Sequence, residues 1–237
     1  MQASGLLKLC ETLKEDMPAA MNAATFRALR TRARCLGGQV AIVKELAAAD
    51  FVKEGKLTTG TKPFNIFARV GSGEMKQPGM EEENKNLGEA GAQFVVACNL
   101  PANDEHWASD DAEWVGKASM AERHRFLTNK DMSWEWFNVL TFGLDGDLAS
   151  LEASVQRLEA VKAAALAFAA ATDGWSAETV GLYLHVFPHN SVYSFHLHML
   201  DGKMGPTFEH FHFKNLPLDD ALAVLKEELA EAMQGSS

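Results

Sequence analysis

The sequence Val192-Tyr-Ser-Phe-His-Leu-His-Met-Leu200 alternates between polar and apolar side chains from Ser194 onward. Successive side chains of a β-strand point to opposite faces of a sheet. The alternation therefore predicts a strand that presents Ser194, His196 and His198 on one face and packs its apolar side chains into a core with the other.

Strand and turn signals flank this segment on both sides. Residues Thr179–Phe187 have β-like composition and end at Pro188, and a further strand is predicted at Phe208–Phe213, after a turn at Asp201-Gly202. Pro217 is suited to the first turn of a closing helix. We therefore expect three consecutive strands followed by a C-terminal helix.

A long helix is predicted before these strands. Asp147 is suited to its N-cap, apolar residues then recur every three or four positions to about Thr172, and Gly174 is suited to its C-terminal stop. The apolar stripe consists of Leu148, Leu151, Val155, Leu158, Val161 and Leu166.

The first half of the chain is predicted to hold shorter strands and an N-terminal helical segment. The strand segments are Phe64–Val70, Phe94–Cys98 and Arg123–Thr128. Residues 75–92 are expected to form a long loop, and residues 3–53 have helical periodicity. This order is typical of an α+β fold, in which helices are segregated from an antiparallel sheet. We expect an N-terminal helical segment at 1–58 and an α+β domain at 59–233.

Composition and charge narrow the classes of function. Of 237 residues, 47% are hydrophobic and 23% are charged, which is typical of a folded globular protein and excludes collagen-like and disordered classes. Acidic residues outnumber basic ones 32 to 22, and the net charge of −10 opposes binding to duplex nucleic acid or to anionic membranes. Because no segment is apolar enough to cross a bilayer, we expect no membrane partner.

Cysteine usage indicates a reducing compartment. Cys10, Cys35 and Cys98 form no CxxC pair, so neither a disulfide framework nor a structural zinc site is predicted. The N-terminus lacks the apolar core of a secretory signal and carries acidic residues such as Glu11. We therefore expect a cytoplasmic protein.

Histidines are concentrated in the region of the last predicted strands. Six of the eight lie between positions 185 and 212: His185, His189, His196, His198, His210 and His212. Near neutral pH, an imidazole can act as a nucleophile, as a general acid or base, or as a metal ligand. This density marks the region as the candidate functional site.

The run Ser191-Val-Tyr-Ser-Phe-His-Leu-His-Met-Leu-Asp-Gly-Lys203 resembles the signature of the histidine triad (HIT) superfamily of nucleotide-binding proteins. In that signature, Ser-Val-Tyr leads into His-φ-His-φ-His-φ-φ and a Gly-containing turn. The preceding Leu184-His-Val-Phe-Pro188 is similar to a His-bearing strand of the scavenger mRNA decapping branch, and Arg123-His-Arg-Phe-Leu127 is weakly similar to the family's His-Phe-Leu strand. The specific match covers residues 184–203, and a looser pattern extends from about 60 to 213.

The resemblance implies a HIT-like antiparallel sheet with a long helix before the triad hairpin, a nucleotide pocket on the sheet and commonly a homodimer. His196 corresponds to the central triad residue, whose neutral imidazole attacks phosphorus and forms a nucleotidyl-histidine intermediate. His198 and His185 correspond to catalytic histidines beside the scissile phosphate. The candidate substrate-binding residues are Ser191, Ser194, Asn190 and Lys203.

The function implied by this resemblance is a hydrolase or nucleotidyl transferase. It would cleave a phosphoanhydride or phosphoramidate bond of a nucleotide or capped dinucleotide through His196, and we expect no cofactor. The chain departs from the family pattern at two places: Ser194 stands at the first triad position, and His189-Asn190 replaces a Gly-Gln pair. A hydroxyl has a shorter reach than imidazole and cannot become cationic near neutral pH. Two hypotheses follow: an enzyme with an altered substrate, or a nucleotide-binding sensor or adaptor that has lost catalysis.

A histidine-lined metal site is a third hypothesis. Glu209-His-Phe-His-Phe213 repeats the alternation without a family counterpart, and a sheet surface is its simpler interpretation. If His210 and His212 lay on a strand facing His196 and His198, four imidazoles could bind a zinc ion. No HExxH or Cys/His spacing supports this arrangement, so no metal ligand is predicted.

Overall fold

The computed structural model describes residues 18–35, 58–59, 62–63, 66–100, 103–131, 136–189, 192, 194–202 and 204–235. These residues combine helices with a five-stranded sheet and a short two-stranded pair, β1 (Thr58–Thr59) with β2 (Lys62–Pro63). The predicted α+β class is therefore confirmed. None of the described helices has the length and apolar composition that a membrane span requires.

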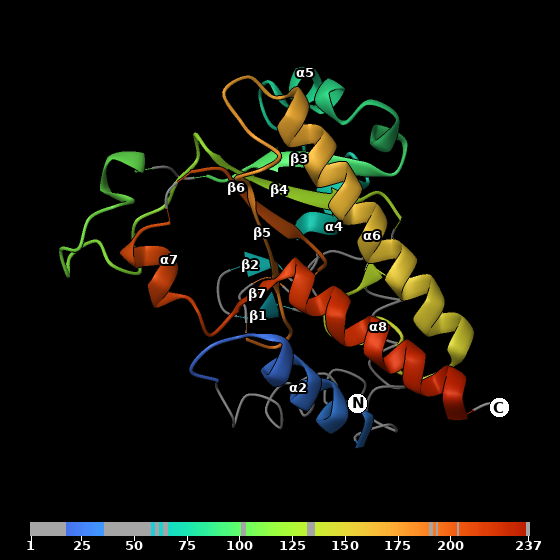
Figure 1. The fold of residues 1–237 in the computed structure, drawn as a ribbon. Helices are drawn as coiled ribbons and strands as arrows, with labels where there is room; N and C mark the ends of the chain where they lie inside the picture. The colour runs from blue at the N-terminus through green and yellow to red at the C-terminus, as the bar shows by residue number, and fades with distance from the viewer. Residues whose placement is uncertain are drawn as a thin grey trace.

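One antiparallel sheet lies at the centre of the fold (Figure 1). Its strands are β3 (Phe94–Cys98), β4 (His124–Asn129), β5 (Gly181–His185), β6 (Leu197–Leu200) and β7 (Asn215–Pro217), in the spatial order β3-β4-β6-β5-β7. Every neighbouring pair is antiparallel. The register places His198 opposite Phe126 on one side and opposite Tyr183 on the other, so these three side chains share a face.

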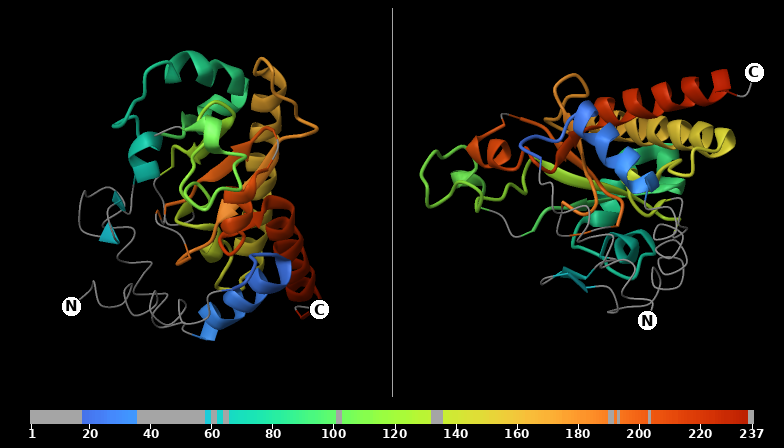
Figure 2. Two further views of the ribbon diagram at one scale, coloured as in Figure 1. Left: turned by 90° about the vertical axis from the view of Figure 1, so that its left-hand side faces the viewer. Right: turned by 90° about the horizontal axis from the view of Figure 1, so that it is seen from below.

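Two long helices run side by side over the other face of the sheet (Figure 2). α6 (Leu148–Ala171) begins after Asp147, whose carboxylate accepts a hydrogen bond from the backbone N–H of Ser150, and α8 (Leu218–Gly235) follows β7 directly. Both predicted helices and the Asp147 N-cap are confirmed. The sheet residues in this main core are Phe94, Val96, Leu127, Leu184, Leu197, Met199 and Leu216.

α2 (Ala23–Cys35) packs on α8 and belongs to the same core through residues such as Phe26 and Leu29. The helical periodicity predicted over 3–53 is confirmed for α2, and the rest of that range lies outside the described residues. The predicted domain boundary at residue 58 stays a prediction.

The predicted strand Phe64–Val70 is wrong, because Ile66–Gly71 form helix α4. Phe67 and Val70 are both buried and lie three positions apart, as residues on one face of a helix do. Over so short an apolar run, the helical and strand periods fit about equally well. Contact with the sheet decides the conformation.

Residues 75–92 also differ from the expected loop. They contain helix α5 (Met80–Glu83) and the 3₁₀ segment η1 (Asn84–Ala92). The side-chain amide of Asn84 bonds to both backbone groups of Val96 in β3, accepting from N–H at 2.7 Å and donating to the carbonyl at 2.8 Å. A polar side chain thus ties this segment to the sheet, which the sequence pattern did not indicate.

The strand predicted at Phe208–Phe213 is replaced by helix α7 (Pro206–His210) and a following turn. Pro206 is favourable at the first helical position, and Phe208 is buried in a small separate cluster that includes Leu200. The metal hypothesis that placed His210 and His212 on a facing strand is therefore wrong. The predicted strand Val192–Leu200 is confirmed only as β6, since regular pairing begins at Leu197.

Candidate functional site

The sheet face opposite α6 and α8 forms the floor of a cavity of about 440 Å³. This volume lies within the range of small-molecule sites in proteins. Neighbouring strands supply the floor residues His124, Phe126, His198, Tyr183 and His185. Aromatic and apolar side chains on the walls include Phe67, Val70, Trp107, Phe208 and Phe211.

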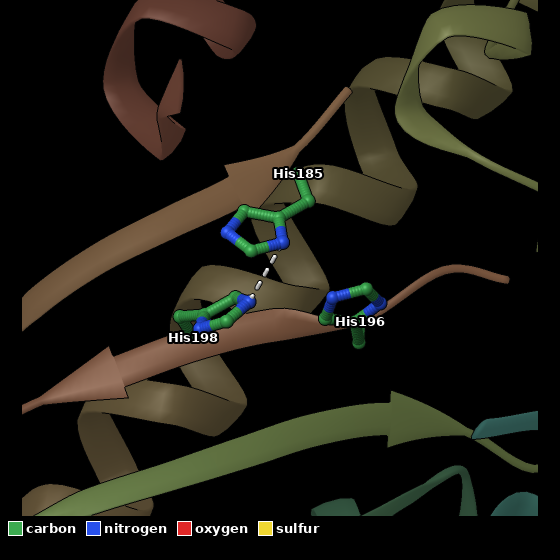
Figure 3. Close-up of side chains that lie close together, drawn as sticks. All are labelled: His185, His196 and His198. Carbon is green, nitrogen blue, oxygen red and sulfur yellow. Dashed lines mark hydrogen bonds between the residues drawn. The ribbon is translucent and has the colours of Figure 1, made fainter. Parts of the chain in front are cut away.

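Three histidines meet in this cavity (Figure 3). His185 ends β5, His196 lies just before β6, and His198 lies within β6. The ring centroid of His198 is 3.9 Å from that of His185 and 5.0 Å from that of His196. The structure thus brings together the three histidines that the sequence named as catalytic candidates.

The backbone carbonyl of Ser194 fixes the protonation pattern of His196. Nδ1 of His196 lies 2.7 Å from that carbonyl oxygen. Because a carbonyl oxygen only accepts, Nδ1 carries the hydrogen, and the neutral ring has its lone pair on Nε2. Phe67 stacks on the ring, with 4.2 Å between the ring centroids, and helps to hold its orientation.

A chain of hydrogen bonds crosses the sheet and takes one residue from each of four adjacent strands. Nε2 of His185 lies 3.0 Å from Oδ1 of Asn215, and Nδ1 of His185 lies 3.2 Å from Nε2 of His198. Nδ1 of His198 lies in turn 2.9 Å from Nε2 of His124. Since the amide oxygen only accepts, His185 and His198 each donate through Nε2 and accept through Nδ1, and His124 donates through Nε2. Asn215 thereby sets the tautomers of three histidines.

Burial keeps the rings of this chain neutral. It lowers the pKa of His124 to about 3. The pKa values of His185 and His198 lie well below the ordinary value, first because of burial and then because of repulsion from neighbouring histidines and Lys214. A charged imidazole has no acceptor nitrogen, so the hydrogen-bond chain requires His185 and His198 to be neutral.

The structure does not place the predicted substrate-binding residues among the described residues of the cavity lining. Ser194 is 1% exposed, and its hydroxyl oxygen accepts a hydrogen bond from the backbone N–H of Phe67 at 3.3 Å. Ser194 therefore anchors α4 and is not among the residues that line the cavity. Asn190, Ser191 and Lys203 lie outside the described residues.

Two histidines that were candidates for a metal site lie elsewhere. The ring of His210 packs against Gly116, where a Cβ would lie 2.6 Å from Cδ2 of that ring. Nε2 of His212 contacts the carboxylate of Glu209 at the surface. Neither residue is among the described residues of the cavity lining.

Sequence reasoning missed two members of the site. His124 stands in Arg123–Leu127, the segment similar to the family's His-Phe-Leu strand, and that similarity was a usable signal. Asn215 has no local signal. It joins the site because β7 pairs with β5, and the register sets Asn215 opposite His185.

His185, His196 and His198 are also the described residues suited to hold a metal ion, since one ring nitrogen from each lies within 4.8 Å of the others. Zinc bound tetrahedrally by imidazoles needs nitrogens about 3.4 Å apart, so the rings would have to move closer. The ion would also have to replace the hydrogen bond between His185 and His198.

The fold and the site define an α+β protein with a partly buried histidine chain on the floor of a small-molecule cavity. In comparisons with known proteins, no family model, no curated protein and no solved structure matches the chain. Membership of the HIT superfamily therefore stays a prediction that rests on the motif residues.

Proposed function

We propose that this chain is a nucleotide-binding hydrolase or nucleotidyl transferase that cleaves a phosphoanhydride or phosphoramidate bond of a nucleotide or capped dinucleotide through His196. The observation that carries the proposal is the 2.7 Å hydrogen bond from Nδ1 of His196 to the Ser194 carbonyl, made by a residue that lines the cavity. It keeps the lone pair on Nε2, as a nucleophilic imidazole requires. The motif resemblance supplies the substrate class.

The chemistry for a phosphoanhydride takes two steps. First, the Nε2 lone pair forms a bond to phosphorus while the bond from phosphorus to the leaving oxygen breaks, and the leaving phosphate takes the bonding electrons. The ring becomes a cation whose Nδ1–H points at the Ser194 carbonyl, and this dipole stabilises the new charge. Then water attacks phosphorus, the P–N electrons return to Nε2, and one water proton passes to solvent.

The remaining histidines support this reaction by position. His185 and His198 are each held by two hydrogen bonds within the chain that runs from Asn215 to His124. Because these rings are ordered before a ligand binds, the floor beside His196 needs little reorganisation during the reaction. The single N–H of each neutral ring is already donated within the chain, so His198 and His185 could donate to phosphate oxygens only if the ligand displaced one of these bonds.

The test compares wild type, His196→Asn and the control His212→Asn, which alters a surface histidine outside the cavity. Each protein is incubated briefly with dinucleoside polyphosphates, a cap analogue or adenosine phosphoramidate. Intact mass is measured after a quench without acid, because phosphoramidates are acid-labile, and products are separated in parallel. We expect an adduct or product with wild type and His212→Asn and neither with His196→Asn. Wild-type turnover by His196→Asn, or no adduct and no product from wild type, would overturn the proposal.

A nucleotide sensor is the second candidate, and the position of Ser194 favours it. The residue at the first triad position accepts a hydrogen bond from Phe67 and lies outside the cavity lining, so it contributes no side chain to a bound phosphate there. Saturable nucleotide binding by wild type, measured by calorimetry, together with no adduct and no product would establish the sensor in place of the enzyme.

A further inference from the structure

Three imidazole rings converge at the floor of the cavity (Figure 3). His185, His196 and His198 each offer one ring nitrogen, and these three atoms lie within 4.8 Å of one another. Nδ1 of His185 and Nε2 of His198 are only 3.2 Å apart. Two imidazole nitrogens on a tetrahedral zinc ion lie about 3.4 Å apart, so the longest of the three spacings has to shorten by no more than about 1.4 Å.

Two of the three rings already have the protonation pattern that a bound metal ion requires. His185 donates Nε2–H to the side-chain oxygen of Asn215 at 3.0 Å, so its lone pair is on Nδ1. His196 donates Nδ1–H to the Ser194 carbonyl at 2.7 Å, so its lone pair is on Nε2. A histidine that binds a metal ion through one nitrogen almost always donates its other N–H to such an oxygen. Asn215 and Ser194 therefore suit the role of outer partners in a metal site.

His198 needs a change of tautomer before it can bind an ion. Its Nε2–H donates to Nδ1 of His185, and its Nδ1 accepts from Nε2–H of His124. If the hydrogen between His124 and His198 shifts to His198, Nδ1 of His198 becomes the donor. His198 then gives up its Nε2 hydrogen, and His124 takes up one at Nδ1. All the rings stay neutral, and no net proton is lost.

The surroundings of His124 favour this shift. Nδ1 of His124 is buried and has no hydrogen-bond partner among the described residues. The backbone of Met120 lies within reach of the ring, and its carbonyl accepts from the amide of Asn99 at 2.9 Å with one of two lone pairs. In the metal-free tautomer, Nδ1 and this carbonyl are both acceptors. With the hydrogen on Nδ1, His124 can donate to the carbonyl, and a buried polar atom gains a partner.

The donor set selects the class of metal ion. Mg²⁺ and Ca²⁺ prefer oxygen ligands, whereas imidazoles suit zinc, copper and nickel. Zinc sites that take part in reactions have three protein ligands and keep a fourth position for water or a substrate oxygen. Because His185, His196 and His198 all line the cavity, the fourth position of an ion held by them faces the space in which a ligand binds.

We propose that His185, His196 and His198 form a zinc site whose fourth position faces the cavity, and that zinc excludes the covalent reaction of His196. An ion on Nε2 of His196 uses the lone pair that would attack phosphorus, so zinc inhibits turnover reversibly. The binding of zinc needs no nucleotide and stands by itself. Only the inhibition rests on the proposed function.

The first experiment measures zinc binding by the full chain after a chelator has removed metal. ZnCl₂ is added, and the zinc that survives dialysis is counted by elemental analysis, while calorimetry gives the dissociation constant. We expect one zinc ion in wild type and in the control His212→Asn, and no binding of MgCl₂. Asn215→Leu should weaken zinc binding about 10–100-fold, the usual effect of removing an outer partner of a zinc-bound histidine.

Removal of the ligands themselves gives the stronger test. A folded His185→Asn, His198→Asn double variant should retain no zinc after dialysis. Undiminished zinc binding by that variant would overturn the site, and so would a wild-type chain that retains no zinc.

Nitrogen NMR of the wild-type imidazoles identifies the ligands without any substitution. Zinc should shift the resonances of Nδ1 of His185 and of Nε2 of His196 and His198 to metal-bound positions. The hydrogens of His198 and His124 should move to Nδ1. Zinc shifts confined to other histidines would overturn the site, and hydrogens that stay on Nε2 of His198 and His124 would overturn the change of tautomer.

Adduct and product formation by wild type is then measured with a chelator and with zinc at saturation, using the nucleotides of the test above and magnesium as the control ion. We expect both with the chelator or magnesium and neither with zinc. Zinc binding with no adduct and no product under any condition keeps the site and removes the covalent function. An adduct in a chain that binds no zinc does the reverse, and an adduct that forms equally with zinc bound overturns the exclusion.

Discussion

The side-chain oxygen of Asn215 lies 3.0 Å from Nε2 of His185, and this one contact determines the direction of every hydrogen bond in the chain that follows. Asn215 is on the edge strand β7, whereas His124 at the far end of the chain is on β4. A residue at the edge of the sheet thus sets the tautomer of a histidine three strands away. The chain exists only when all four strands are in register.

Asn215→Leu tests this control, because leucine has similar volume and no acceptor. The N–H of His185 would lose its partner in a buried place, and we expect the free energy of unfolding to fall by about 1–3 kcal/mol. Measured turnover should show a lower kcat with little change in KM. Nitrogen NMR of the imidazoles should show mixed tautomers for His185 and His198 in place of one.

Asn86→Leu is the matched control, since the amide of Asn86 donates to the hydroxyl of Thr172 away from the cavity. It should leave the imidazole spectrum and kcat as in wild type. Asn215→Asp retains an acceptor and should keep more activity than Asn215→Leu. If His185 and His198 each kept a single tautomer in Asn215→Leu, a group other than Asn215 would determine the direction of the hydrogen bonds.

The sequence predicted those elements whose signals are local. α6 has a capping residue at Asp147, a sustained apolar stripe and a glycine with positive φ at Gly174. These signals lie within the local sequence and can be identified without knowledge of the tertiary contacts. α4 and α7 were predicted as strands because short apolar or alternating runs fit either period. Burial of Phe67 against the sheet and of Phe208 against Leu200 decides both conformations.

The residues of the candidate site also fall into two groups, those that a local motif predicted and those that only strand pairing brings together. His196 and His198 are two positions apart, and the sequence motif singled them out together with His185. His124 and Asn215 are 91 positions apart in the chain and are joined only through the strand order β4-β6-β5-β7. A hydrogen bond across strands depends on register, which local periodicity does not fix.

Ser194→His would introduce the histidine that the HIT signature has at this position, and we expect it to damage the protein. Ser194 is 1% exposed and already binds the N–H of Phe67. An imidazole there would overpack the site, and we expect a loss of about 1–3 kcal/mol in the free energy of unfolding. Urea denaturation and turnover measure the two effects. Ser194→Ala, which adds no volume, is the control, and a more stable and more active Ser194→His would contradict this account.

Glu228 should make stability depend on pH. Its carboxylate accepts hydrogen bonds from Arg30 and Arg34, and Arg30 is fully buried. Burial raises the pKa of Glu228, but these hydrogen bonds and charges together hold the pKa below its ordinary value. Since the folded pKa is the lower one, the stabilisation is complete above the unfolded pKa of about 4.3 and is lost as pH falls through the folded pKa.

Glu228→Gln should therefore lower the free energy of unfolding at pH 7 by about 3–5 kcal/mol, because it leaves a buried guanidinium without its counter-charge. Urea denaturation between pH 2.5 and 7 should show this difference from wild type shrinking below about pH 4. Glu227→Gln removes a carboxylate from an exposed pair with Arg27 and should cost less than about 1 kcal/mol. Parallel pH curves for wild type and Glu228→Gln would disprove the assignment.

Gly116→Ala tests how the loop that contains Gly116 packs against α7. Gly116 has a φ of +77°, and an added Cβ would lie 2.6 Å from Cδ2 of His210. Gly146 has the same φ with nothing within 4 Å of its Cβ position, so Gly146→Ala measures the backbone strain alone, about 1–2 kcal/mol. We expect Gly116→Ala to lose a further 1–3 kcal/mol, roughly, from the overlap. In urea denaturation, adding His210→Ala to Gly116→Ala should remove this extra loss of unfolding free energy. Equal losses for Gly116→Ala and Gly146→Ala would contradict the close packing of this loop on α7.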